Sequence, residues 1–332
     1  MIRKKKIALV TGGAGFIGSH MVDLLLSKGY FVRVIDNLSG GHKKNLKHCL
    51  KNKNIKFRNY DICKLKPNDT FFKKVSYVFH FAGIGDIVPS IENPEKYMFT
   101  NVQGTIKVLE ASRYNNIKKL IYAASASCYG KTKGLTSENH KINIEHPYAL
   151  SKYLGERAVI HWNKVYKLPT NSIRIFNAYG PRVRTTGAYG AVIGVFLKQK
   201  IKNKSLTIVG DGKQSRDFVY VTDVCRAFLA AANTKLTKQI YNVGTGDPQT
   251  VNTLAKLIGG KKVFIPDRPG EPRTSKADIR KIRNQLKWKP KVKFNEGINI
   301  LLGLINNWKD APLWTPKKIK KATKVWFNFL SR

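Results

Sequence analysis

The segment Thr11-Gly12-Gly13-Ala14-Gly15-Phe16-Ile17-Gly18 lies between a short apolar run, residues 7–10, and a stretch that we expect to be helical to about Lys28. Glycines at this spacing let a diphosphate approach the backbone N–H groups at the start of the helix, where a Cβ atom would block it. The next apolar run ends at Asp36. A carboxylate there accepts hydrogen bonds from the adenosine ribose hydroxyls and repels a 2′-phosphate. The segment therefore predicts a dinucleotide-binding turn that favours NAD over NADP.

Short apolar runs and helical stretches alternate through the first half of the chain. Strands are expected near residues 31–35, 55–57, 75–81, 120–124 and 172–176, and helices near residues 94–115 and 148–166. This alternation predicts an α/β fold with a doubly wound parallel sheet, which is a Rossmann domain. We expect that domain over residues 1–176, with a segment near 215–245 returning to it. A smaller mixed α/β substrate lobe with C-terminal helices is expected over 177–214 and 246–332.

Composition excludes several classes of protein. The 332 residues are 42% hydrophobic and 24% charged, which is typical of a globular chain and not of a disordered one. The apolar runs are far shorter than the roughly 18 residues that a membrane span needs, so no integral membrane contact is expected. Four cysteines without a Cys-x-x-Cys pair or a Cys/His cluster indicate neither a disulfide scaffold nor a metal site. We therefore expect a cytoplasmic location.

The formal net charge of +41 would attract anions, whether nucleic acid, an acidic membrane surface or phosphorylated metabolites. The lysines and arginines are scattered along the chain without a nucleic-acid-binding motif. We therefore interpret the charge as a compositional excess of lysine and expect no nucleic-acid partner. The basic and apolar segment 317–330 is expected to close on the smaller lobe as a helix, and a membrane-surface helix is the alternative.

Tyr148 and Lys152 lie one helical turn apart, so their side chains share one face of the expected helix. An ammonium group near a phenol favours the phenolate and lowers the tyrosine pKa from about 10 toward neutrality. Such a tyrosine can take a proton from an alcohol. Ser125 ends the strand 120–124, at the edge where a parallel sheet presents side chains to a ligand. Ser125, Tyr148 and Lys152 are the candidate catalytic residues.

Almost end to end, the chain resembles the extended short-chain dehydrogenase/reductase superfamily and, within it, the nucleotide-sugar epimerases and dehydratases, most of all the UDP-glucose 4-epimerases. The residues that carry this resemblance are Thr11–Gly18, Asp36–Ser39, Asp61-Ile62, Phe81–Gly83, Asn101–Thr105, Ser125–Gly130, Tyr148–Lys152, Arg174–Arg182, Arg216–Asp223 and Asn242–Gly244.

The resemblance implies which residues form the site. The implied NAD-binding residues are Gly12, Gly15, Phe16, Ile17, Gly18, Asp36, Asn37, Asp61, Ile62, Phe81, Ala82, Gly83, Asn101, Tyr148 and Lys152. The implied substrate-binding residues are Ser125, Ser127, Asn177, Tyr189, Arg216, Arg268 and Ser275. It also implies a homodimer joined through the helices near 94–115 and 148–166. One departure is Gly85, where UDP-glucose 4-epimerases often carry a lysine that contacts the cofactor.

The two residues after Ser125 discriminate among related reactions. The 4,6-dehydratases carry an acid–base pair there, and UDP-glucuronate decarboxylases carry a glutamate at the second position, whereas this chain has Ala126 and Ser127. Cys128 lies one residue beyond the catalytic cysteine position of the related 3,5-epimerases, and we interpret it as a core residue. The resemblance thus implies an NAD-dependent epimerase that inverts C4 of a nucleotide-diphosphate sugar through a 4-keto intermediate.

Other functions stay open at this point. A dehydratase, decarboxylase or reductase on the same fold is the nearest alternative, and a non-catalytic NAD-sensing or RNA-binding protein is a more distant one. Ser275 aligns where some relatives carry a bulky tyrosine beside the hexose. The smaller side chain leaves room for a UDP-hexose, a UDP-N-acetylhexosamine or a UDP-hexuronic acid. Arg182, Arg184 and Arg273 are candidates to pair with an acidic sugar.

Overall fold

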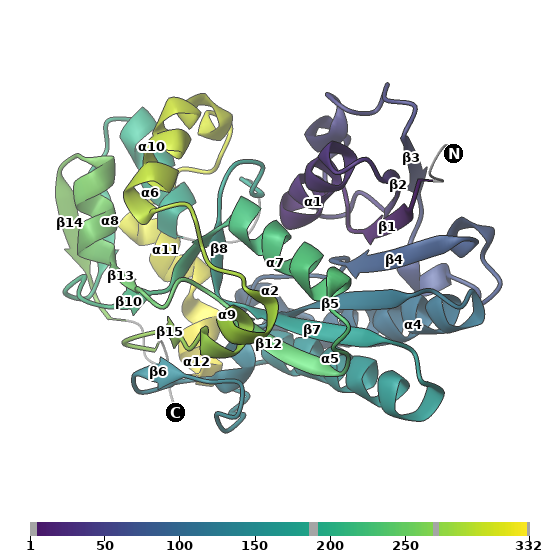
Figure 1. Ribbon diagram of the computed structural model, residues 1–332. Coiled ribbons are helices and arrows are strands. Elements are labelled where there is room, and N and C mark those ends of the chain that lie inside the picture. Colours follow the sequence, from purple (N-terminus) through teal and green to yellow (C-terminus); the bar gives the residue numbers. More distant parts are fainter. Residues whose placement is uncertain (1–4, 186–191, 268–271, 331–332) are drawn as a thin grey trace.

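The computed structural model describes residues 5–185, 192–267 and 272–330, and its central layer is a seven-stranded sheet (Figure 1). The strand order is β12-β7-β5-β4-β1-β2-β3, and every neighbouring pair is parallel. This confirms the doubly wound α/β fold. The strands are β1 Ile7–Thr11, β2 Phe31–Asp36, β3 Ile55–Asn59, β4 Val75–His80, β5 Lys119–Ser125, β7 Thr170–Ile175 and β12 Gln239–Val243.

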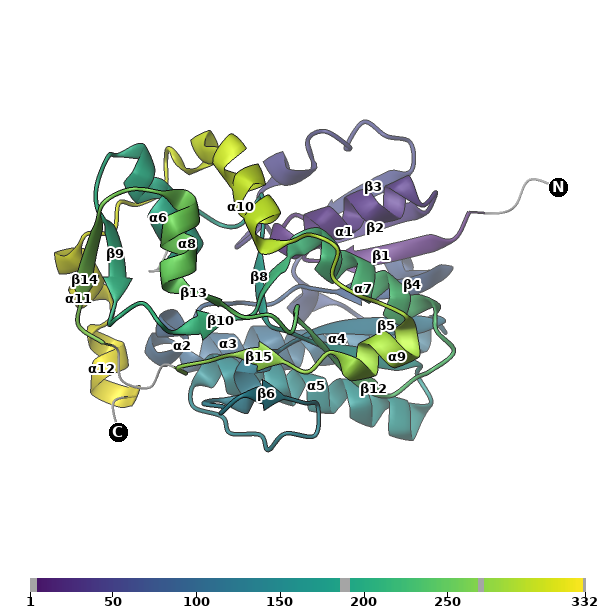
Figure 2. The ribbon, with the colours of Figure 1, turned by 60° about the vertical axis from the view of Figure 1, so that its left-hand side comes forward.

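Helices cover both faces of this sheet, as Figure 2 shows. Successive strand residues point to opposite faces. Val10 therefore packs toward α1 (Phe16–Ser27) and α7 (Val221–Asn233), whereas Leu9 packs toward α4 (Gly104–Tyr114) and α5 (Pro147–Tyr166). Because helices cover both faces, β1 and β4 are largely apolar and do not alternate, which is typical of buried parallel strands. β7 is also buried, although four of its six residues are polar.

A second hydrophobic cluster lies beyond the carboxyl ends of the strands, on the left in Figures 1 and 2. It is built from α6 (Val192–Ile201), β9 (Leu206–Val209), α8 (Val251–Ile258) and α10 (Phe294–Gly303), and β14 (Lys262–Ile265) pairs with β9. The return of the chain to the first lobe is visible in β12, which pairs with β7. The expected domain boundaries themselves stay a prediction.

The remaining elements are short. They are α2 Val88–Glu92, α3 Pro94–Met98, α9 Arg280–Leu286, α11 Pro316–Ala322, α12 Lys324–Leu330, β6 Leu135–Thr136, β8 Asn177–Tyr179, β10 Ser215–Arg216, β11 Phe218–Tyr220, β13 Gln249–Thr250 and β15 Lys276–Ala277. Single turns of 3-10 helix lie at Lys43–Leu46, Ile62–Lys64, Thr70–Phe72, Ala126–Tyr129 and Ile305–Trp308.

Two expected helices differ from the prediction. The helix expected near 94–115 is divided into α3 and α4 by a π-helical turn, Phe99–Gln103, which carries Asn101 inward. The C-terminal segment forms two helices in place of the single expected helix, and α12 packs against α2 of the first lobe. Among the described residues, no helix is long and apolar enough to cross a bilayer.

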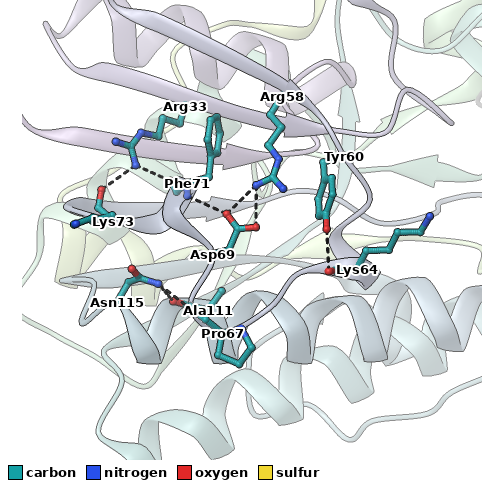
Figure 3. Close-up of polar contacts among 10 residues, drawn as sticks. All are labelled: Arg33, Arg58, Tyr60, Lys64, Pro67, Asp69, Phe71, Lys73, Ala111 and Asn115. Carbon is teal, nitrogen blue, oxygen red and sulfur yellow. Dashed lines mark hydrogen bonds and ion pairs between the residues drawn. The ribbon is translucent and has the colours of Figure 1, made fainter.

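Polar contacts anchor the outer edge of the sheet at β3 (Figure 3). Arg58 on β3 donates to both carboxylate oxygens of Asp69 at 2.8 Å, and Asp69 also accepts from the backbone N–H of Phe71. Arg33 on the neighbouring strand donates to the carbonyl oxygens of Phe71 and Lys73. These contacts hold the chain that follows β3, which forms one end of the cavity described next.

Candidate active site

A cavity of about 1040 Å³ lies between the carboxyl ends of the central strands and the second hydrophobic cluster. Parallel α/β sheets bind ligands at this edge, near the point where the strand order reverses between β1 and β4. Its volume is at the upper end of the range for a single small-molecule site, so it has room for a dinucleotide and a second ligand.

The glycine turn between β1 and α1 forms one wall. Gly12 has a φ of +69°, and a Cβ atom on it would lie 2.6 Å from the backbone nitrogen of Ala82. Gly15 precedes the first residue of α1, and both glycines line the cavity. The first N–H groups of α1 have no partners within the helix, so the turn is a cradle that fits a diphosphate.

Asp36 at the end of β2 is 7% exposed and lines the same cavity. Its two carboxylate oxygens accept from the backbone N–H groups of Ala14 at 2.9 Å and Leu38 at 2.7 Å. Burial raises the pKa of Asp36, and these backbone hydrogen bonds act against that rise. Each oxygen keeps a second lone pair, which fits the expected contact with ribose hydroxyls.

The loop after β4 forms the floor of the cavity. Thr11 and Thr105 contact the two ring nitrogens of His80 at 2.6 and 3.0 Å, and burial lowers the pKa of His80 to about 3. Asn101 lies beneath this loop, where it accepts from the N–H of Ile84 and donates to the carbonyl oxygen of Ile84. Asn101 is 1% exposed and is not among the described residues that line the cavity. It positions the loop, and its expected contact with the cofactor stays a prediction.

The three candidate catalytic residues come together in the cavity. Ser125, Tyr148 and Lys152 all line it, and the hydroxyl oxygens of Ser125 and Ser127 lie 2.8 Å apart. The Lys152 amine lies 4.5 Å from the centre of the Tyr122 ring, a cation–π distance. The spacing of Tyr148 and Lys152 on α5 therefore produces the shared site that the sequence predicts.

The expected lowering of the Tyr148 pKa is wrong. Burial raises the pKa of Tyr148, and hydrogen bonding to Ser125 only partly opposes it. Burial also lowers the pKa of Lys152 to about 7, with Glu156 acting against the shift. Loss of hydration of the charged form is therefore the largest cause of both shifts.

The other predicted residues divide into three groups. Those found on the cavity wall are Phe16, Ile17, Gly18, Asn37, Asp61, Ile62, Phe81, Ala82, Gly83, Ser127, Asn177, Arg216 and Ser275. Tyr189 and Arg268 lie outside the described residues. Cys128 is 2% exposed and belongs to the core, as expected.

The arginines proposed for an acidic sugar do not act as a group. Arg182 pairs with Asp23 at 2.7 Å and Arg273 pairs with Asp211 at 2.5 Å. Arg184 does line the cavity. Arg182 and Arg273 therefore each have a carboxylate partner within the chain.

Sequence reasoning missed the residues that surround Tyr148. Its backbone N–H donates to the hydroxyl of Ser90 at 3.1 Å, and its ring lies between those of Tyr97 and His146. A proline directly before Tyr148 marks the first turn of α5 and so marks His146 as the capping residue. That signal was present in the sequence, whereas the ring contacts of Tyr97 depend on the tertiary fold.

The sequence and the fold of this chain are similar to those of known proteins. The NAD dependent epimerase/dehydratase family matches residues 8–244. The UDP-glucose 4-epimerase of Mycolicibacterium smegmatis is 34% identical over 299 residues, which are 87% of this chain and 95% of that protein.

Two solved structures are similar over nearly their whole length. The UDP-glucose 4-epimerase of Thermotoga maritima with UDP-glucose has a TM-score of 0.83 and 34% identity, covering 91% of this chain and 99% of that one. The UDP-glucuronic acid 4-epimerase of Bacillus cereus with UDP-glucuronic acid and NAD has a TM-score of 0.83 and 30% identity, with the same coverage.

Proposed function

The chain belongs to the NAD dependent epimerase/dehydratase family, and from this premise we propose that it is an NAD-dependent isomerase that inverts C4 of a UDP-sugar. The observation that carries the proposal is the convergence of Ser125, Tyr148 and Lys152 on the same cavity that the glycine turn lines.

The residues present fit NAD. The turn at Gly12 and Gly15 accepts a diphosphate without a Cβ clash, and Asp36 offers free lone pairs to a ribose. Bound NAD would supply the acceptor and the donor of the C4 hydride.

Tyr148 is the group that takes the proton of the C4 hydroxyl and later returns a proton to the C4 oxygen, once hydride has been added to the opposite face of C4. Burial raises the pKa of Tyr148, and the hydrogen bond with the Ser125 hydroxyl acts to lower it. The same hydroxyl can donate to the 4-keto oxygen. Lys152, with a pKa of about 7, can carry or release a proton near neutral pH.

A Tyr148→Phe substitution tests the assignment directly. It should lower the rate of interconversion of C4 epimers at least about 10²-fold, because a positioned proton-transfer group contributes this much to the rate. The bound NAD should remain, since the cradle is unchanged. The measurement is nuclear magnetic resonance of purified protein with UDP-glucose, UDP-N-acetylglucosamine and UDP-glucuronate, with heat-released NAD determined in parallel. Unaltered epimerisation by the variant would refute the role of Tyr148.

A dehydratase, decarboxylase or reductase is the competing function on this fold. Ala126 and Ser127 lack the carboxylates that the first two reactions would use at these positions. A product with the same mass as its substrate supports the epimerase. A loss of water or carbon dioxide, or a gain of two hydrogens, would select the alternative.

We propose that the cavity accepts more than one kind of UDP-sugar. Ser275 lines it with a small side chain, which supports room for a C2 acetamido or C6 carboxylate group besides a plain hexose.

We also propose a homodimer. Exposed apolar side chains of Phe99, Leu150 and Leu154 lie on or beside α5 and support a dimer through this helix and α4. Light scattering of the intact protein tests the dimer, and we propose the cytoplasm as its location.

A further inference from the structure

We propose that His146 is a positioning residue for the reaction: it caps α5 with one ring nitrogen and stacks its ring on Tyr148, so that the phenol is held in one orientation. The inference rests on the proposed function, because it assigns the orienting group of the same site. Neither His146 nor its contacts entered the assignment of the catalytic residues.

The cap is the first contact. His146 has an extended backbone immediately before Pro147, the first residue of α5, and its Nδ1 accepts from the backbone N–H of Ala149 at 3.2 Å. Asparagine, aspartate, serine and threonine usually occupy this position, so a histidine here is unusual. The imidazole must be neutral and carry its proton on Nε2, since Nδ1 accepts.

The ring stack is the second contact. The rings of His146 and Tyr148 are nearly parallel, at 4°, with their centres 5.9 Å apart. Tyr97 meets Tyr148 edge-on at 6.4 Å and 78°, and its hydroxyl donates to the carbonyl oxygen of Gly85. The phenol of Tyr148 is therefore held by one parallel ring and one perpendicular ring, both within the range of favourable aromatic pairs.

Through these two contacts, His146 alone fixes both the backbone and the side chain of Tyr148. The cap fixes the first turn of α5, on which Tyr148 is the second residue, and the stack fixes its ring. A group that transfers protons must be held within about 0.5 Å of its productive position. Burial lowers the pKa of His146 to about 4, so the neutral form that both contacts use persists at ordinary pH.

Two substitutions separate the cap from the stack. His146→Asn keeps a good capping side chain and removes the ring, whereas His146→Phe keeps a ring and removes the capping acceptor. We expect His146→Asn to retain the melting temperature and KM of the wild type while kcat falls about two- to tenfold, the range set by one aromatic pair. We expect His146→Phe to melt lower but to keep kcat closer to the wild type.

Trp162→Phe is the matched control on the same helix. It removes the hydrogen bond from Trp162 Nε1 to Glu110, 2.7 Å long, far from Tyr148. It should lower the melting temperature without changing kcat. A second readout is independent of any activity: the resonance of Tyr148 in protein labelled with ¹³C-tyrosine, identified by its loss in Tyr148→Phe. The Tyr148 resonance should move in His146→Asn, because the stacked ring is lost. It should stay nearly in place in Trp162→Phe, which keeps that ring.

A Tyr148 resonance that does not move in His146→Asn overturns the inference, whether or not the wild type epimerises any sugar. So does an unchanged kcat in His146→Asn, or an equal loss of kcat in both His146 variants at a temperature where both are folded. A wild type that epimerises no nucleotide sugar, with the resonance shifted as expected, refutes the proposed function and leaves the positioning role standing.

Discussion

Glu156 and Arg174 form a buried ion pair, and replacing Glu156 by glutamine should destabilise the protein far more than breaking a surface pair. Their side chains are 1% and 4% exposed, and two guanidinium nitrogens of Arg174 donate to the carboxylate at 2.6 to 3.2 Å. Burial acts to lower the pKa of Arg174, but the hydrogen bonds that Glu156 accepts raise it above its ordinary value. An arginine guanidinium is not deprotonated in proteins, so it stays charged when its partner carboxylate is removed.

The magnitude follows from the cost of leaving that charge without a carboxylate. Breaking a buried pair by removing one partner costs about 3–5 kcal/mol. With an unfolding entropy of about 2.1 cal/mol/K per residue, 332 residues give about 0.7 kcal/mol/K near 60 °C. If the protein unfolds in one step, Glu156→Gln should then lower the melting temperature by about 4–7 °C.

Differential scanning calorimetry of the NAD-loaded protein measures this shift, and Arg113→Gln is the control. Arg113 pairs with Glu110 at 2.8 Å on the surface, where a pair is worth about 0–1 kcal/mol. Its loss should lower the melting temperature by less than about 1.5 °C. Equal shifts for the buried and the surface variant would refute the reasoning that burial sets the cost.

Two further predictions concern the cavity. Between the lowered pKa of Lys152, about 7, and its ordinary value of 10.5, the unfolded chain binds more protons than the folded one, so the unfolding free energy rises with pH. In NAD-free protein, Lys152→Met should therefore stabilise more at pH 6 than at pH 9 in urea titrations, and a pH-independent difference would contradict this. Gly12→Ala should lose bound NAD, because the new Cβ would meet Ala82 at 2.6 Å. Gly29→Ala has a similar φ of +77° in open space and should keep NAD, as chromatography of the heat-released cofactor would show.

The sequence predicted those parts of the site that depend on chain-local spacing. The glycine turn, Asp36 at the end of its strand, and Tyr148 one turn before Lys152 are each fixed by a few neighbouring residues, and all line the cavity. The direction of the Tyr148 pKa was not predictable in this way, because it depends on burial by segments distant in the chain.

Partners that meet only after folding were also missed. Arg182 looked available for a substrate, but Asp23, from a helix 159 positions earlier in the chain, pairs with it. The hydrogen bonds between Asn101 and the backbone of Ile84 were not predicted either. In both cases the sequence pattern did not reveal the contact within the chain, since a side chain's neighbours are set by packing between elements.

The position of β12 has a consequence for how the protein is made. β7 ends at Ile175 and β12, which completes the sheet beside it, ends at Val243, so 68 residues (243 minus 175) must follow before the outer edge of β7 is paired. At about 5–20 residues per second, a nascent chain carries that bare edge for several seconds. The unpaired edge of a strand can recruit other chains. We therefore expect the nascent chain to be open to wrong pairing at β7 until β12 has been made.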